Sequence, residues 1–214
     1  MAWGEASSLE SAVQQVVRLV AAGYRYYLTD MVPERKDPAG LDSKLDELYE
    51  LSLSEDQRYR RKAERKANVT LVRLGRWFVL MATPPRDLEA HRLYQRENHK
   101  IRSVRERPIR LGDYTISQKW STVDSKWHVV VRLRRSVFLG LRARLVYEAE
   151  GLSKRKLEAE FRKLTYMGYT PVVEDLWRIF EAANHKRKER GLPELDKSCV
   201  PVRFVKSKPL KEAA

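Results

Sequence analysis

Residues 69–83 read VTLVRLGRWFVLMAT, and this stretch decides the fold class. Two runs of apolar and β-branched residues flank Gly75-Arg76, and a glycine at the first position of a two-residue turn is typical of a type II′ hairpin. The return run from Trp77 to Ala82 is apolar at consecutive positions, which indicates that both of its faces are covered. We therefore predict an antiparallel hairpin whose second strand is central in a sheet.

Upstream of the hairpin, the pattern is helix, strand and helix. Apolar residues repeat at helical spacing over residues 8–22, and an aromatic and β-branched run follows over residues 24–32. Asp37 followed by Pro38 has the residue types of a helix start, because Asp caps the first turn and Pro fits within it. We expect the three elements in that order.

A second capping pattern begins a basic helix over residues 54–67. Ser54 and Gln57 have the spacing of a capping box, and the run RYRRKAERK follows from Arg58 to Lys66. This run offers almost no apolar stripe, so we predict that the helix is not held by burying a core face. It would then lie in solvent or on a charged partner.

The patterns downstream of the hairpin complete an α+β fold. We expect a mixed or antiparallel sheet with an N-terminal helix and a C-terminal helical segment, and a ferredoxin-like core is one arrangement that fits. The downstream elements are a short polar helix at 87–98, strands at 101–110, 114–121 and 126–134, and helices at 136–150, 153–165 and 171–190, with Ser153 and Thr170 as caps and Gly191 as a stop. The predicted domains are a sheet domain at 1–135, a helical segment packed on it at 136–191, and an irregular basic tail at 192–214.

The charge is strongly positive and unevenly distributed along the chain. The 214 residues carry a net charge of +14, but residues 1–57 have five basic and eleven acidic side chains, whereas residues 58–214 have 38 and 18. A potential this positive attracts polyanions, and each phosphate that Lys or Arg neutralises releases condensed counterions. We therefore predict a nucleic-acid partner, DNA or RNA, rather than a membrane. Solubility alone is the plainer explanation of the same charge.

The predicted contact surface is basic and aromatic. Arginine predominates on the β segments, which suits bidentate phosphate contact and stacking on bases. Trp127 could also stack on bases, but it lies on an alternating apolar face, so we expect it in the core. The candidate stacking residues are Tyr59, Tyr114 and Trp120. The candidate nucleic-acid contacts are Arg58, Arg60, Arg61, Lys62, Arg65, Lys66, Arg73, Arg76, Arg102, Arg105, Arg107, Arg132 and Arg134.

This sequence lacks the residue patterns that several function classes require. The one cysteine, Cys199, excludes an intramolecular disulfide, and with four scattered histidines it offers no metal-binding spacing. Phosphate-binding loops and dinucleotide-binding glycine motifs are absent, so we expect no small-molecule cofactor. There is no signal-peptide pattern and no apolar run of membrane-spanning length, and we expect a cytoplasmic protein.

Two chemical alternatives act on the same polymer. Asp113 on a strand with Gln118-Lys119 loosely resembles the arrangement of restriction-type nucleases, which would require Mg²⁺, but adjacent side chains point to opposite faces of a strand. His128 resembles half of the paired-histidine motif of rolling-circle initiators and small transposases, with Val130 at the second histidine position and Tyr26 as the candidate nucleophile.

The leading hypothesis is a nucleic-acid-binding protein of a mobile-element, replication or defence system, which uses an arginine-rich sheet face and a basic helix. One alternative is a metal-dependent nuclease or a strand-transfer enzyme acting through Tyr26, His128 or Asp113. The other is a structural component of a ribonucleoprotein. Whether the protein is an enzyme, and its oligomeric state, are left open by the sequence.

Overall fold

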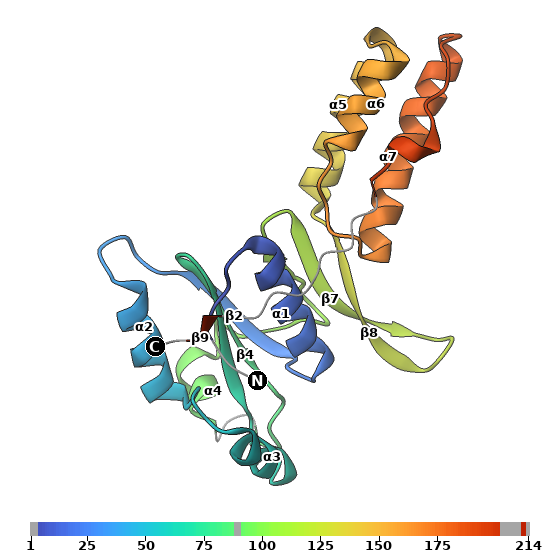
Figure 1. Cartoon of the computed structure of the whole chain (residues 1–214). Helices are drawn as coiled ribbons and strands as arrows, with labels where there is room; N and C mark the ends of the chain where they lie inside the picture. The colour runs from blue at the N-terminus through green and yellow to red at the C-terminus, as the bar shows by residue number, and fades with distance from the viewer. Residues whose placement is uncertain (1–3, 88–90, 202–210, 213–214) are drawn as a thin grey trace. The chain divides into compact units, whose positions relative to one another are not determined.

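The computed structural model of the chain describes residues 4–87, 91–201 and 211–212 (Figure 1). It divides into two compact units. The first, called the sheet unit, consists of Met1–Gly112, Ile116–Val130 and Ser207–Ala214. The second, called the helical unit, consists of Asp113–Thr115 and Val131–Lys206. The predicted packing of residues 136–191 on the sheet domain stays a prediction.

A six-stranded mixed sheet forms the centre of the sheet unit, in the order β5-β2-β4-β3-β1-β9. All neighbours are antiparallel except β1 and β3, which are parallel. This sheet and the seven helices among the described residues confirm the predicted α+β class. The strands are β1 Gly4–Glu5, β2 Tyr26–Met31, β3 Val69–Leu74, β4 Trp77–Ala82, β5 Arg102–Ser103 and β9 Lys211–Glu212.

The hairpin of β3 and β4 has the predicted register and place. Leu74 pairs with Trp77 across a turn in which Gly75 has a φ of +58°, the left-handed conformation that the first position of a type II′ turn requires. β4 lies between β2 and β3, and its residues from Phe78 to Ala82 are all buried. The prediction of a central strand covered on both faces is confirmed.

Four helices surround this sheet, and their caps explain where they begin. Ser8 caps α1 and Asp37 caps α2, each through a side-chain oxygen that accepts a backbone N–H. Ser54 and Gln57 form both hydrogen bonds of a capping box at the start of α3. The helices are α1 Leu9–Ala21, α2 Pro38–Tyr49, α3 Glu55–Ala63 and α4 Arg92–Glu97.

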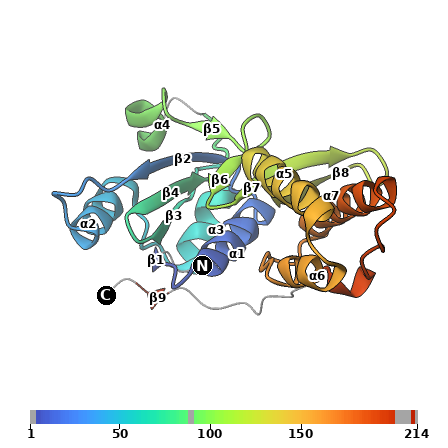
Figure 2. The same cartoon turned by 90° about the horizontal axis from the view of Figure 1, so that it is seen from above.

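Helices α2 and α4, which connect strands of the sheet, pack into one hydrophobic core. Leu45 of α2 and Leu93 of α4 belong to the same buried cluster as Leu28, Leu71 and Leu80 of the strands. Helix α1 packs against β3, and Figures 1 and 2 show it on the other side of the sheet from α4. The run β5-β2-β4-β3, antiparallel at each step, is the strand order of a ferredoxin-like sheet.

A smaller sheet has the order β6-β7-β8, formed by β6 Ile109–Leu111, β7 Tyr114–Ser121 and β8 Lys126–Leu133. The prediction of one strand over 101–110 is wrong, because β5 ends at Ser103 and β6 begins at Ile109. Between them the Ser103 carbonyl accepts backbone N–H groups from Glu106 and Arg107, which closes a turn. Pro108 follows and has no N–H to donate to a ladder.

The helical unit consists of α5 Arg135–Gly151, α6 Lys154–Arg162 and α7 Thr170–Glu189, close to the predicted ranges. Ser153 caps α6 as predicted, and Gly191 follows α7 with a φ of +66°. The predicted cap at Thr170 is wrong, because α7 begins at that residue and no side chain caps it. No described helix is long and apolar enough to cross a membrane.

A buried arginine joins the ends of two of these helices. Arg187 of α7 is almost fully buried and donates to the carbonyls of Ala149, Leu152 and Pro193 at distances of 3.1, 2.9 and 2.6 Å. Part of the predicted irregular tail is ordered beyond this point, since residues 197–199 form a 3₁₀ turn (η1) with Cys199 buried. Most of the remaining predicted tail lies outside the described residues.

Candidate functional site

Arg58, the first predicted nucleic-acid contact, lies inside the sheet unit. Its exposed fraction is 8%, and it donates to the carbonyls of Leu51, Leu53 and Val69 and to the hydroxyl of Tyr24. The prediction that α3 is not held by burying a core face is therefore wrong, because the helix buries the Arg58 guanidinium. Arg58 is a structural residue and is not available to a phosphate.

Arg73 is a second correction of the same kind. Its guanidinium lies 2.9 Å from a carboxylate oxygen of buried Asp42 and 3.1 Å from one of Glu5. Burial raises the pKa of Asp42, and the hydrogen bond from Arg73 opposes that shift. The charges of Arg73 and Asp42 therefore neutralise each other. Arg73 therefore holds β3 to α2 and to β1, and it presents no free cation to a partner.

Three more predicted contacts are engaged within the protein. Arg76 donates to the carbonyls of Val32 and Lys36 at 3.1 and 3.0 Å. Arg132 lies 3.0 Å from buried Asp175. Tyr114, a predicted stacking residue, is buried, and its hydroxyl accepts the backbone N–H of Met167, so that prediction is wrong.

Other predicted residues do reach the surface. Tyr59 is 76% exposed, one residue after the inward-facing Arg58 on α3. The half-buried ones are Arg61, Arg105 and Arg134. The exposed cations among the predicted contacts are Arg60, Lys62, Arg65, Lys66, Arg102 and Arg107, of which Lys66 forms an ion pair with Glu64.

An aromatic and cationic cluster lies near the turn of the β7–β8 hairpin. Trp120 and Trp127 are each the second residue from that turn, and their rings meet edge to face with centroids 5.6 Å apart. The Arg105 guanidinium carbon lies 3.8 Å from the centroid of the Trp127 ring. Trp120 is 50% and Trp127 39% exposed, so the prediction that Trp127 is a core residue is wrong. We call these three residues the tryptophan platform.

The hairpin explains why the tryptophan platform is exposed. On β7, Ile116 and Gln118 are buried, and the Gln118 amide donates to the carbonyl of Val20 of α1. Trp120 is the next residue on that face, and it is half-exposed where Ile116 and Gln118 are buried. Trp120 therefore continues the alternation of Ile116 and Gln118 but lies in solvent.

Arg105 is held in place from both sides. Its Nε donates to the Gln118 side-chain oxygen at 3.1 Å, while its planar face covers Trp127. Burial lowers the pKa of Arg105, and the nearby charge of Arg25 adds to this effect. The guanidinium stays charged at neutral pH, since an arginine titrates far above it. The platform thus offers aromatic surface and a fixed positive charge together.

The three candidate catalytic residues are not joined by any described hydrogen bond, ion pair or ring contact. Tyr26 is half-buried and stacks edge to face on Tyr94, and His128 pairs with Asp124 at 2.6 Å on the surface. Asp113 is exposed, and its backbone carbonyl accepts from Arg134. Across the described part of the chain, no group of three or more His, Cys, Asp or Glu side chains is placed to hold a metal ion.

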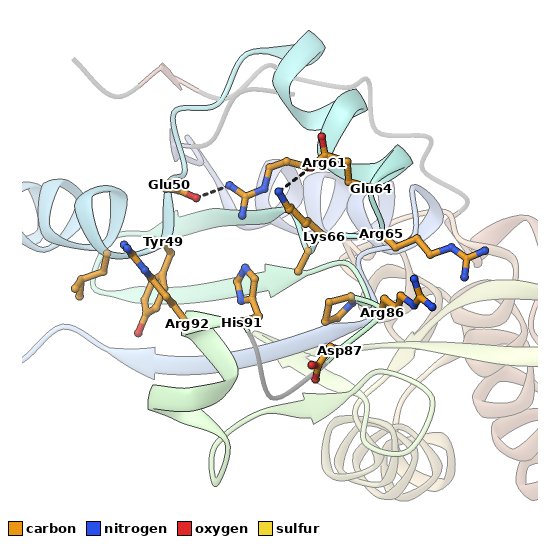
Figure 3. A pocket seen from close by; sticks show the side chains of 13 residues that line it. Tyr49, Glu50, Arg61, Glu64, Arg65, Lys66, Arg86, Asp87, His91 and Arg92 are labelled. Carbon is orange, nitrogen blue, oxygen red and sulfur yellow. Dashed lines mark hydrogen bonds and ion pairs between the residues drawn. The ribbon is translucent and has the colours of Figure 1, made fainter.

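A pocket of about 420 Å³ lies between the end of α3 and the start of α4 in the sheet unit (Figure 3). Figure 3 shows Arg61 and Lys66 on one side of it and His91 and Arg92 on the other. The sequence predicted the α3 residues as contacts but not Arg86, His91 or Arg92. Nothing in their spacing marked them, because they reach the pocket only when β4 and α4 are in place.

No protein-family model, curated protein or solved structure matches this chain. The function is therefore inferred from the chemistry of the residues that the fold brings to the surface.

Proposed function

We propose that the protein binds single-stranded nucleic acid on the tryptophan platform of the β7–β8 hairpin. The observation that carries this proposal is the exposed Trp120–Trp127 pair with the Arg105 guanidinium stacked on it. Bases stack on aromatic side chains with about 1–3 kcal/mol per base, and arginine adds cation–π attraction. A single strand offers unstacked base faces to such a platform, whereas a duplex covers them.

The charge around the platform supports the same partner. Lys119 and Lys126 are exposed neighbours of the two tryptophans along the chain, and among the described residues neither forms an ion pair. Exposed lysines of this kind contact the phosphates that link stacked bases, without reading their sequence. Together with the net charge of +14, they favour a polyanion over an apolar protein surface.

The test compares two platform variants with a matched exposed aromatic residue elsewhere. Trp127→Ala and Trp120→Ala each remove a ring from the platform, and Tyr147→Ala removes one that is 83% exposed on α5. Binding of fluorescent single-stranded and duplex DNA and RNA is measured by anisotropy between 50 and 300 mM salt. We expect single strands to bind best and each tryptophan variant to weaken them about 5- to 150-fold. The Tyr147→Ala variant should bind as the wild type does.

Two outcomes would overturn the proposal. One is the absence of salt-dependent binding to any strand by the wild-type protein. The other is equal affinity of both tryptophan variants and the Tyr147→Ala control. Running each mixture on a denaturing gel, with Mg²⁺ or with EDTA, separates binding from cleavage. Metal-dependent fragments would replace the binding proposal by the nuclease alternative.

A further inference from the structure

The pocket of Figure 3 is lined by more cations than carboxylates. Two of its cations are paired, Arg61 with Glu50 and Lys66 with Glu64. Three other lining residues, Arg65, Arg86 and Arg92, form no ion pair among the described residues. The lining holds one further carboxylate, Asp87. A concave site with this surplus of guanidinium groups attracts an anion of more than one charge.

One donor of the pocket lacks an acceptor. The Nε atom of Arg61 is buried, and no described residue accepts a hydrogen bond from it. A buried N–H without an acceptor costs about 1–3 kcal/mol, so structures rarely leave one unpaired. A small movement of the Arg61 side chain would turn this N–H toward the pocket, where an oxygen of a bound ligand accepts its hydrogen bond.

The backbone conformation at Arg65 also indicates that its side chain has a role in binding. Arg65 has a φ of +56°, and the N–H groups of Arg65 and Lys66 donate to the carbonyls of Lys62 and Arg61, which is a Schellman ending of α3. Glycine is the usual residue at this left-handed position, and another residue there costs about 1–2 kcal/mol. A strained arginine at the rim of a cationic pocket points to a role in binding.

The remaining lining supplies a neutral donor and an apolar wall. The Nδ1 atom of His91 accepts the backbone N–H of Leu93 at 3.2 Å. In the neutral ring the proton is then on Nε2, which becomes a donor. Leu48, Tyr49 and Pro85 form the apolar part of the lining. A pocket of about 420 Å³ with these surfaces is of a size that suits a small organic anion.

We infer that this pocket binds a phosphate monoester carried by a nucleoside-sized group. The dianion would lie between Arg65 and Arg86, which are neighbours because the Arg86 backbone N–H donates to the Arg65 carbonyl, and the organic part would lie against Pro85 and extend toward Tyr49 and Leu48. A terminal monoester is favoured over an internal phosphodiester because it carries more charge and enters a concave site end-on. The same group occurs on a free mononucleotide and at the phosphorylated end of a strand. This inference does not depend on the tryptophan platform.

The experiment uses the full chain and adenosine monophosphate as the probe, with adenosine and inorganic phosphate alongside. Calorimetric titration is carried out on the wild type and on Arg65→Gly, Arg86→Gln and Arg35→Gln. Arg65→Gly removes a pocket cation while relieving the left-handed strain, so it should fold at least as well as the wild type. Arg35→Gln is the matched control, because Arg35 is exposed in the same unit and does not line the pocket.

We expect adenosine monophosphate to bind the wild type and the control, and each pocket variant to weaken it at least tenfold. Adenosine should not bind. Competition then identifies the source: displacement by a 5′-phosphorylated oligonucleotide but not by its 5′-hydroxyl form indicates a strand end, and no displacement by either indicates a free nucleotide. The inference is overturned if adenosine monophosphate and the phosphorylated strand both fail to bind, or if the pocket variants bind as Arg35→Gln does. Trp127→Ala should leave this titration unchanged, which separates it from the proposed function.

Discussion

Replacing Arg58 should destabilise the sheet unit far more than replacing its neighbour Arg60. In Arg58→Met the aliphatic stem is kept, but the donors to Leu51, Leu53, Val69 and Tyr24 are lost. These acceptors then lie in a site from which the methionine side chain excludes water. Arg60 is exposed on the same helix, so Arg60→Met removes the same charge but from the protein surface.

The expected size follows from the number of acceptors left behind. Each buried acceptor without a partner costs about 1–3 kcal/mol, and the lost hydrogen bonds come from a charged donor. Relief of the desolvation cost of the guanidinium offsets part of this loss, and we expect a net loss of about 3–5 kcal/mol in the free energy of unfolding. For a protein of this size such a loss lowers Tm by about 6–20 °C. An exposed substitution such as Arg60→Met stays within about 0.5 kcal/mol.

Urea titrations followed by far-UV circular dichroism and by tryptophan fluorescence measure both variants against the wild type. Agreement of the two probes would show that one transition is being followed. Arg58→Lys keeps the charge but not the fork of donors, and it should fall between the wild type and Arg58→Met. The reasoning is refuted if Arg58→Met loses less than about 1 kcal/mol, the size of an ordinary surface effect.

Three further predictions concern Arg187, Cys199 and His91. Arg187→Met should lower the stability of the helical unit by several kcal/mol, because the carbonyls of Ala149 and Leu152 lose their donor; thermal unfolding of this variant beside exposed Arg178→Met checks it. Burial raises the pKa of the Cys199 thiol to about 11, so Ellman's reagent at pH 7 should react slowly with the native protein and fast in urea, and a fast native reaction would contradict it. Burial, and next the charge of Arg61, lower the pKa of His91, so folding favours its neutral form. Stability from this residue is complete above the ordinary histidine pKa and is lost as the pH falls below it, and His91→Asn should reduce the loss of Tm between pH 7 and 5.5.

The elements of this fold follow largely from local sequence. Asp37 and the Ser54–Gln57 pair cap helices at the predicted places, since a capping hydrogen bond joins residues only two or three positions apart. Gly75 closes the predicted hairpin for the same reason, because a two-residue turn is decided by the conformations of its own residues. The break at Pro108 lay within a run that otherwise had a strand pattern, and Ser103 and the turn after it ended that strand early.

The candidate sites depended on contacts between distant segments. Arg58 and Arg60 stand two residues apart in one basic run, yet Arg58 alone meets the carbonyls of Leu51 and Val69. Trp127 has the alternation of a core residue, but it lies near the turn of the hairpin, where β8 is exposed. The charge and hydropathy of a residue indicate whether its side chain favours water or the interior. Packing between residues far apart in the sequence decides which side chains are buried. The sequence by itself therefore determined the α+β class, the caps and the excess of positive charge. Only the tertiary structure decided which arginines hold the fold and which remain exposed.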